Sequence, residues 1–256
     1  MMLKTSSFER KLKSITPSSL KKILVYFLVN GFFGKAIKRL NLRWNLFGGV
    51  FNYSLVSDIE AAKIFWGIWE SAEIRFSKRF ANTNSIVELG SSVGVTLGVL
   101  SNIRSQTKFI CIEASSENFK KLSLLKKSLS NKNEYILINK AVAYGVENIG
   151  FEFSTTTGSK INKSLTNNNF LIPAITLNQI LINNNISEDY TLITDIEGAE
   201  ADIFFKDKAA LKNCSCIIAE LENTKNYSID DQIQRLIGLG FSIIERYGSV
   251  VVMQRS

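Results

Sequence analysis

From residue 84 onward, short apolar runs alternate with stretches of helical periodicity. Runs that suit buried strands begin at positions 85, 108, 135, 190 and 215, and most are followed by a segment with a one-sided apolar pattern. Two further runs, 241–244 and 249–253, stand close together and predict a final antiparallel pair. This alternation predicts an α/β fold of Rossmann-like type, built on a mostly parallel sheet.

The segment 85–94, Ser-Ile-Val-Glu-Leu-Gly-Ser-Ser-Val-Gly, joins the first of these strands to a helix. Gly90 and Gly94 allow the backbone to turn sharply and to approach a ligand closely, because no Cβ intervenes. A strand, a tight glycine loop and a helix form the nucleotide-facing corner of a Rossmann-like sheet. An ordinary strand-to-helix turn is the alternative, since the glycine spacing alone is weak.

The remaining segments predict how the rest of the chain is organised. Residues 57–60 form a capping box, and apolar residues between positions 62 and 80 recur at helical spacing, so one amphipathic helix is expected over 57–83. The third strand is expected to continue to residues 140–142, and the polar segment 155–169 to form a loop. The expected domains are a basic arm over 1–56, the helix over 57–83 and a ligand-binding domain over 84–256.

The composition restricts the possible chemistry. The chain has no histidine, which removes the commonest general base and the commonest metal ligand. The three cysteines, Cys111, Cys214 and Cys216, lie in apolar runs and indicate buried thiols in a reducing compartment, so a cytoplasmic protein is expected. Acid–base catalysis would therefore fall to carboxylates, lysines or tyrosines.

The net charge of +8 belongs to the N-terminal arm. Residues 1–43 hold ten lysines and arginines and a single acid, whereas the rest of the chain is close to neutral. The apolar segment 23–33 within the arm is too short to span a bilayer. The arm suits contact with the inner face of an anionic membrane, or packing of a helix on the domain or on a second subunit. Nucleic-acid binding is the weaker alternative.

Acids stand at the ends of four expected strands, and the carboxyl ends of parallel strands lie at one edge of a sheet, where ligands bind. These acids are Glu88, Glu113, Asp195 and Glu220. They would repel one another unless a hydroxyl-rich or cationic ligand, or a metal, lies among them. Glu113 follows Gly90 by 23 residues, close to the spacing of an acid that binds ribose hydroxyls. An acid before the loop suits a cationic group, which favours S-adenosylmethionine over a pyrophosphate cofactor.

The segment 88–94, Glu113, 140–142 and especially 194–200, Thr-Asp-Ile-Glu-Gly-Ala-Glu, resemble the FkbM family of S-adenosylmethionine-dependent methyltransferases. Glu88 stands where the family commonly has Asp, and Ser91-Ser92 where it commonly has Ala-Asn. The resemblance implies a seven-stranded class I methyltransferase fold with an antiparallel final strand, here with an N-terminal helical extension. It also implies O-methylation of a sugar, a polyketide or another small molecule. The expected cofactor-binding residues are Glu88, Gly90, Ser91, Ser92, Gly94, Glu113, Ala141 and Asp195.

Carboxylates are the expected catalytic groups. Asp195 is the first candidate for the base that takes up the hydroxyl proton, and Glu197 the second. Alternatively Asp195, Glu197 and Glu220 hold a divalent cation such as Mg²⁺, which prefers oxygen ligands. Glu200 is interpreted as an acid at a helix N-terminus.

Three other functions stay open. A catalytically silent nucleotide-binding scaffold with a membrane-surface arm is one. A nucleic-acid methyltransferase is another, although the two prolines, Pro17 and Pro173, do not form the Pro-Pro motif of enzymes that methylate amino groups. An NAD-dependent oxidoreductase is the least favoured, because the loop lacks a third glycine.

Overall fold

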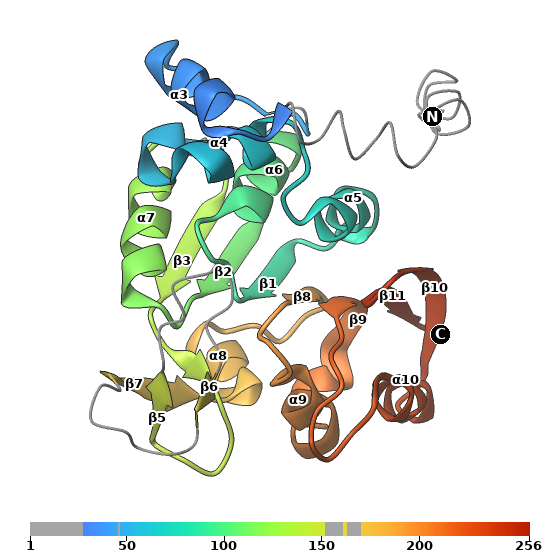
Figure 1. Cartoon of the computed structure of the whole chain (residues 1–256). Helices are drawn as coiled ribbons and strands as arrows, with labels where there is room; N and C mark the ends of the chain where they lie inside the picture. Colours follow the sequence, from blue (N-terminus) through green and yellow to red (C-terminus); the bar gives the residue numbers. More distant parts are fainter. Residues whose placement is uncertain (1–27, 46, 152–160, 163–169) are drawn as a thin grey trace. The chain divides into compact units, whose positions relative to one another are not determined.

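The structure is a computed structural model that describes residues 28–45, 47–151, 161–162 and 170–256 (Figure 1). The chain divides into two compact units. Of the described residues, the first unit comprises 28–45 and 52–69, and the second comprises 47–51, 70–151, 161–162 and 170–256. Half of the predicted basic arm over 1–56, residues 1–27 and 46, lies outside the described residues.

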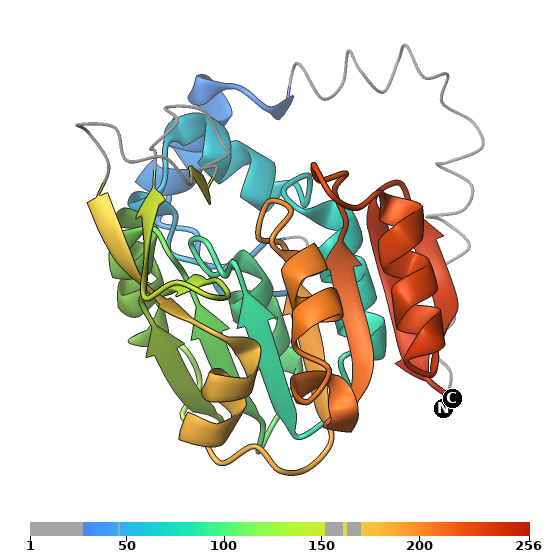
Figure 2. The ribbon, with the colours of Figure 1, turned by 90° about the horizontal axis from the view of Figure 1, so that it is seen from below.

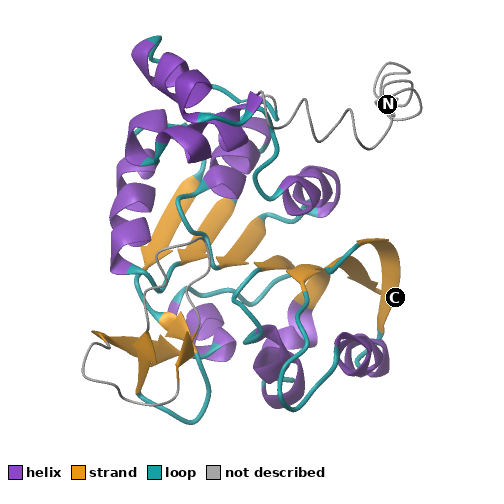
Figure 3. Ribbon diagram, viewed as in Figure 1, coloured by secondary structure: helices purple, strands orange, loops and turns teal. Residues whose placement is uncertain are grey.

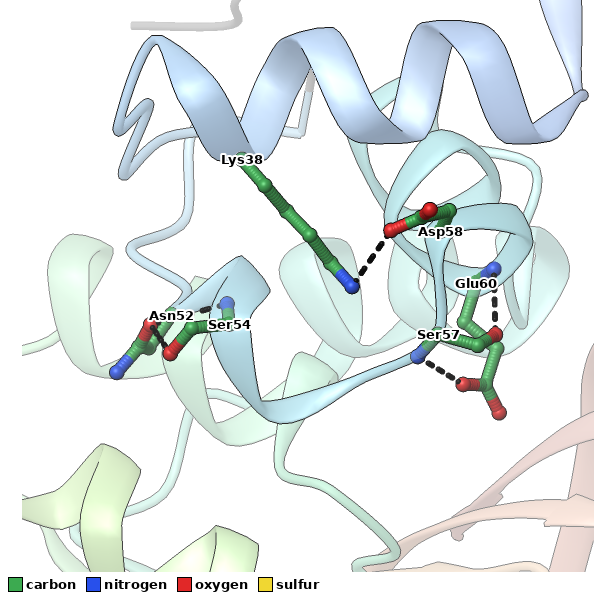
Figure 4. A network of polar contacts seen from close by, with 6 residues as sticks. All are labelled: Lys38, Asn52, Ser54, Ser57, Asp58 and Glu60. Carbon is green, nitrogen blue, oxygen red and sulfur yellow. Dashed lines mark hydrogen bonds and ion pairs between the residues drawn. The ribbon is translucent and has the colours of Figure 1, made fainter.

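The first unit contains two short α-helices and a 3₁₀ turn. They are α3 (Gly31–Arg39), η1 (Tyr53–Leu55) and α4 (Asp58–Phe65). The predicted capping box is present: the Ser57 hydroxyl accepts from the Glu60 amide, and the Glu60 carboxylate accepts from the Ser57 amide (Figure 4). Lys38 of α3 forms an ion pair of 2.8 Å with Asp58, the first residue of α4 (Figure 4). Within the described part of the chain, no helix combines the length and apolar character needed to cross a bilayer.

The single helix predicted over 57–83 is interrupted. Helix α4 ends at Phe65, and a separate helix α5 (Ser71–Phe80) begins in the second unit. Between them, Gly67 and Glu70 have φ angles of +66° and +44°. A left-handed residue ends an α-helix, because its carbonyl no longer points along the axis. The apolar periodicity continues through this turn, which is why the sequence pattern indicates one helix.

A seven-stranded sheet forms the centre of the second unit. Its strands are β1 (Ser85–Leu89), β2 (Lys108–Ile112), β3 (Glu134–Ile138), β8 (Tyr190–Thr194), β9 (Cys214–Glu220), β10 (Phe241–Tyr247) and β11 (Val250–Arg255). Their order is β10-β11-β9-β8-β1-β2-β3, and only β11 runs antiparallel to its neighbours (Figure 2). The predicted mostly parallel sheet with an antiparallel final strand is confirmed.

Helices cover both faces of this sheet (Figures 1 and 3). Helices α5, α6 (Val95–Ile103) and α7 (Ser116–Lys126) pack on one face. Helices α8 (Leu177–Asn183), α9 (Glu200–Lys206) and α10 (Ile229–Gly238), with the turn η2 (Ala210–Asn213), pack on the other. Both faces of β1 are thus buried, as its near-continuous apolar run predicts.

A second sheet of four strands is inserted between β3 and α8. It comprises β4 (Ala141–Val142), β5 (Asn148–Phe151), β6 (Ile161–Asn162) and β7 (Phe170–Ile175), in the order β4-β7-β5-β6. The expectation that the third strand continues to residue 142 is wrong, because β4 pairs with β7 instead. Asn139 turns the chain here by donating its side-chain amide to the carbonyls of Glu113 and Ala114. The predicted loop 155–169 lies mostly outside the described residues, except that 161–162 form β6.

Candidate functional site

The loop after β1 is held against the ends of both neighbouring strands. The amides of Gly90 and Ser91 donate to the carbonyl of Ile112 at the end of β2, at 2.9 and 3.0 Å. Gly90 has a φ angle of +82°, and a Cβ on it would lie 1.9 Å from the carbonyl oxygen of Asp195. No other residue fits a position that is both left-handed and this crowded. Gly90 therefore allows the segment 88–94 to lie directly against the segment 194–200, which carries Asp195.

Glu113 joins the same loop to the end of β2. One carboxylate oxygen accepts from the Ser92 amide at 2.8 Å, and the other accepts from the Ser115 amide at 2.7 Å. The residue is 7% exposed, and burial raises its pKa while these two hydrogen bonds act in the opposite direction. A carboxylate can accept about four hydrogen bonds. Glu113 thus positions the loop and keeps lone pairs that can accept from ligand hydroxyls.

Glu88, one residue before the end of β1, is also buried. Its side chain lies beside Cys111, whose thiol donates to it at 3.5 Å, and burial raises the pKa of Glu88 to about 8. Ser91 is buried in the loop, and its hydroxyl donates to the Glu88 carbonyl at 3.2 Å. Gly94, with φ +84°, donates its amide to the Ser91 carbonyl and precedes α6. The predicted residues of this corner therefore form one connected turn.

Asp195 directly follows β8 and lies against the end of β1, where its amide donates to the Leu89 carbonyl at 3.1 Å. Burial raises the pKa of its carboxyl to about 7, with further contributions from the carboxylates of Glu220, Glu197 and Glu222. A carboxylate with a pKa near neutrality is suited to accept a proton at the pH of a cell. The structure thus brings the first candidate base to the glycine loop.

The rest of the acidic motif forms a tight turn before α9. Glu197 and Gly198 have φ angles of +55° and +91°. Glu200, the first residue of α9, is fully buried, and its carboxylate accepts from the Ile196 amide across the turn. Burial raises the pKa of Glu200 to about 8. Its position agrees with the predicted helix N-terminal acid, and its contact shows that it shapes the turn that carries Asp195.

Glu220 ends β9 and accepts a hydrogen bond of 2.8 Å from the Ser249 hydroxyl. Among residues 28–45, 47–151, 161–162 and 170–256, no group of three or more acidic or cysteine side chains is arranged to hold a metal ion. The alternative in which Asp195, Glu197 and Glu220 bind Mg²⁺ stays a prediction.

The sequence interpretation missed one acid at this edge. Glu73, in the first turn of α5, is 5% exposed, and its Oε2 atom is buried without a hydrogen-bond partner. Burial raises the pKa of Glu73 well above its ordinary value, and Glu70, Asp195, Glu88 and Glu220 raise it further. The signal available in the sequence was an acid within the apolar helical stripe.

Ala141 lies on the other side of the site, in the inserted sheet. It is 2% exposed and packs in a small apolar cluster beside Ala114, the residue after Glu113. The inserted sheet therefore borders the end of β2. A cavity of about 420 Å³ in this region is lined by Ala143, Gly145, Val146, Glu147, Ala174, Ile175, Thr176 and Gln179. None of the predicted site residues lines it.

The sequence of this chain matches a family of methyltransferases. Residues 89–248 match the family described as "Methyltransferase FkbM domain". The chain has no match among curated proteins. Solved structures with a similar fold include magnesium protoporphyrin IX methyltransferase from Synechocystis PCC 6803 with bound SAM (11% identity, 94% of this chain and 99% of that chain, TM-score 0.45). Fibrillarin from Aeropyrum pernix in complex with S-adenosyl-L-methionine is another (11% identity, 72% and 74%, TM-score 0.43).

Proposed function

This chain belongs to the FkbM family of S-adenosylmethionine-dependent methyltransferases, and on that premise we propose that it methylates a hydroxyl oxygen of a sugar, a glycan or another small molecule. The observation that carries the proposal is the position of Asp195. It follows β8, its amide donates to the Leu89 carbonyl at the end of β1, directly before the glycine loop, and burial raises its pKa to about 7. These are the requirements for a carboxylate that accepts a hydroxyl proton beside a bound methyl donor.

The residues at the edge of the sheet fit this donor. S-adenosylmethionine, when bound, supplies an electrophilic methyl group on a positively charged sulfur. Glu113 keeps free lone pairs for ribose hydroxyls, and the loop 90–94 has the left-handed glycines that permit close approach of a ligand. Glu88 and Asp195 form no ion pair with any lysine or arginine of the described residues, so a cationic ligand would be attracted to them.

Catalysis in this proposal consists mostly of positioning. The acceptor oxygen has to lie in line with the methyl carbon and the sulfur, and holding both partners in that geometry supplies much of the rate enhancement. Asp195 takes the hydroxyl proton as the new oxygen–carbon bond forms, and later releases that proton to solvent. Glu197 is the second candidate for this role, since it follows Asp195 in the same turn.

The inserted sheet is our candidate for the acceptor-binding wall. It borders the donor edge through Ala141 and Ala114, and its cavity of about 420 Å³ is large enough for part of a sugar-sized molecule. Because the cavity carries Glu147 and Gln179 among apolar residues, it offers hydrogen-bond acceptors to hydroxyls.

The test is transfer of labelled methyl groups from S-adenosylmethionine to a panel of monosaccharides, glycans and lipid-linked sugars. We expect transfer to at least one hydroxyl acceptor, and the same assay with a metal chelator tests whether a divalent cation takes part. Donor binding without any transfer to these acceptors would favour the silent scaffold. Transfer to RNA or DNA instead would favour a nucleic-acid methyltransferase.

We also propose that the first unit contacts an anionic membrane surface. Phe32, Leu40 and Trp44 are 78%, 70% and 52% exposed, and Lys35 and Arg39 on α3 are exposed as well. Aromatic and basic side chains together favour the interface of an anionic bilayer. Co-sedimentation with anionic vesicles should exceed that with zwitterionic vesicles; equal sedimentation, or dimer formation that buries these residues, would contradict the proposal.

A further inference from the structure

Helix α5 brings an acid to the donor site from outside the sheet. Ala72 and Phe76 of this helix pack in the same apolar cluster as Ile218 of β9 and Val252 of β11. Only four residues separate the end of α5 from the start of β1, so the helix runs back along the sheet in the direction opposite to β1. Its first turn, which contains Glu73, therefore lies at the edge where the parallel strands end.

The surroundings of Glu73 are negatively charged. The carboxylates that act on it are Glu70 at the start of its own helix, Glu88 of β1, Asp195 after β8 and Glu220 of β9. Within the described residues, Glu73, Glu88, Asp195 and Glu220 form no ion pair with a lysine or arginine. These four acids come from four different elements and converge without a counter-charge.

The basic residues on neighbouring elements are engaged elsewhere. On α5 itself, Arg75 lies over the ring of Tyr247 and Arg79 pairs with Glu245. Lys78, the third basic residue of α5, donates to the carbonyl of Phe47. Helix α6, which packs on α5, has no charged side chain. Arg255, the one charged residue of β11, donates to the backbone carbonyls of Cys214, Leu211 and Leu239. The chain therefore supplies no cation to this cluster in its described part.

An unpaired buried carboxylate is costly, so such a cluster either binds protons or attracts a cationic ligand. Glu73 is the clearest example of such a buried carboxylate, because its Oε2 atom is buried and lacks any hydrogen-bond partner. Glu113, by contrast, has both oxygens bonded to backbone amides of the chain. A donor with a positively charged sulfur would satisfy the acids that the chain leaves unpaired.

We propose that Glu73 is a donor-site residue that recognises the sulfonium charge of S-adenosylmethionine and thereby favours the donor over the demethylated product. The inference rests on the proposed function. When the methyl carbon leaves sulfur for the acceptor oxygen, the electron pair of the broken bond stays on sulfur, which becomes a neutral thioether. The hydroxyl proton passes to Asp195. The attraction between Glu73 and sulfur is therefore lost in the same step, which promotes product release.

The first experiment compares the binding of S-adenosylmethionine and S-adenosylhomocysteine by calorimetry. Both ligands carry the same ammonium and carboxylate groups and differ only in the methyl group and the positive charge that it places on sulfur. We expect Glu73→Gln to weaken S-adenosylmethionine binding about tenfold and S-adenosylhomocysteine binding less than about threefold. The matched control is Glu134→Gln. It removes an exposed charge at the start of β3, the end of the strand that lies away from the site, and should leave both affinities unchanged.

The second experiment uses the unmodified chain, so it does not depend on the folding of a variant. Ligand binding near pH 6.5 is measured in buffers of different ionisation enthalpy, which reveals how many protons are released. The sulfonium should force buried acids to ionise, so S-adenosylmethionine should release more protons than S-adenosylhomocysteine. Glu73→Gln should reduce that difference.

The outcomes separate the two proposals. Equal changes in affinity for the two ligands, or equal proton release, would overturn the role of Glu73 while leaving the methyltransferase function intact. Failure of the unmodified chain to bind S-adenosylmethionine would overturn the proposed function, and this inference with it.

Discussion

The carboxylates at the two halves of the sheet edge have different surroundings. On the side of β1 and β2, which we call the donor side (88–94 and Glu113), Glu113 has its oxygens bonded to the amides of Ser92 and Ser115. On the side of β8 and β9, the reaction side (195–200, Glu220 and Glu73), Asp195 and Glu73 are crowded by other carboxylates. Backbone amides of the chain satisfy the oxygens of Glu113, whereas carboxylates accumulate around Asp195 and Glu73.

This difference in surroundings indicates that the two sides have different roles. A loop whose amides are already bonded keeps its shape without a ligand, which reduces the entropy that donor binding must overcome. Asp195 and Glu73, whose pKa values are raised by burial and by nearby carboxylates, respond to charge and to protons, which is what a methyl transfer changes. We therefore propose that the donor side binds S-adenosylmethionine and that the reaction side takes up the hydroxyl proton. Four predictions test this contrast, in order of decreasing effect.

The largest effect is expected for Asp195→Asn. The amide is similar in shape and cannot take up the hydroxyl proton, so methyl transfer should fall by about 10³-fold. Donor affinity should change by less than about threefold, as measured by calorimetry. Turnover close to that of the unmodified chain would remove Asp195 from the role of base. An equal loss of donor binding would break the contrast between the two sides.

Gly90→Ala should disturb both sides at once. The new Cβ would clash with the Asp195 carbonyl at 1.9 Å and would impose a left-handed alanine, so the free energy of unfolding should fall by about 3 kcal/mol. Gly48→Ala is the matched control, because Gly48 has nearly the same φ angle, +83°, with open space around it. It should cost only about 1 kcal/mol. Urea unfolding measures both, and equal losses would show that the close approach at Gly90 is unimportant.

Glu113→Ala should weaken donor binding with little direct effect on the reacting groups. It removes the acceptor of two loop amides as well as the predicted partner of the ribose, so affinity should fall about thirtyfold, or about 2 kcal/mol. Glu117→Ala, on the exposed surface of α7, should bind as the unmodified chain does. The donor side loses its assigned role if both variants bind the donor equally well.

The smallest effect, counted for one group over one pH unit, is a dependence of stability on pH. The pKa values of Glu88, Asp195 and Glu200 are raised to about 8, 7 and 8, so the folded chain holds protons that the unfolded chain has released. Stability should therefore decrease as pH rises from about 5 to 8, by at most about 1.4 kcal/mol per pH unit for each group. Thermal unfolding across this range measures the slope. Asp195→Asn should flatten it, and a slope of opposite sign would contradict the burial argument.

Much of the fold follows from local patterns. The apolar runs of the sequence predict the buried strands at 85–89, 108–112 and 190–194. The four consecutive residues 57–60 predict the capping box at Ser57. The break between α4 and α5 was not predicted, because the apolar period continues across Gly67 and Glu70. The separation of β4 from β3 depends on Asn139, whose bonds to the carbonyls after β2 join residues 25 and 26 positions apart.

The sequence alone determined the family and the acids at the strand ends. The glycine loop and the segment 194–200 are continuous stretches of sequence, so they can be recognised without the structure. The family match confirms the predicted family. The tertiary structure alone decided how each acid is used. Glu113 accepts hydrogen bonds from two backbone amides, and Glu73 lies on α5, a helix that precedes the sheet in the chain. The reason is physical: periodicity and turns depend on neighbouring residues, whereas burial and repulsion depend on groups that only packing brings together.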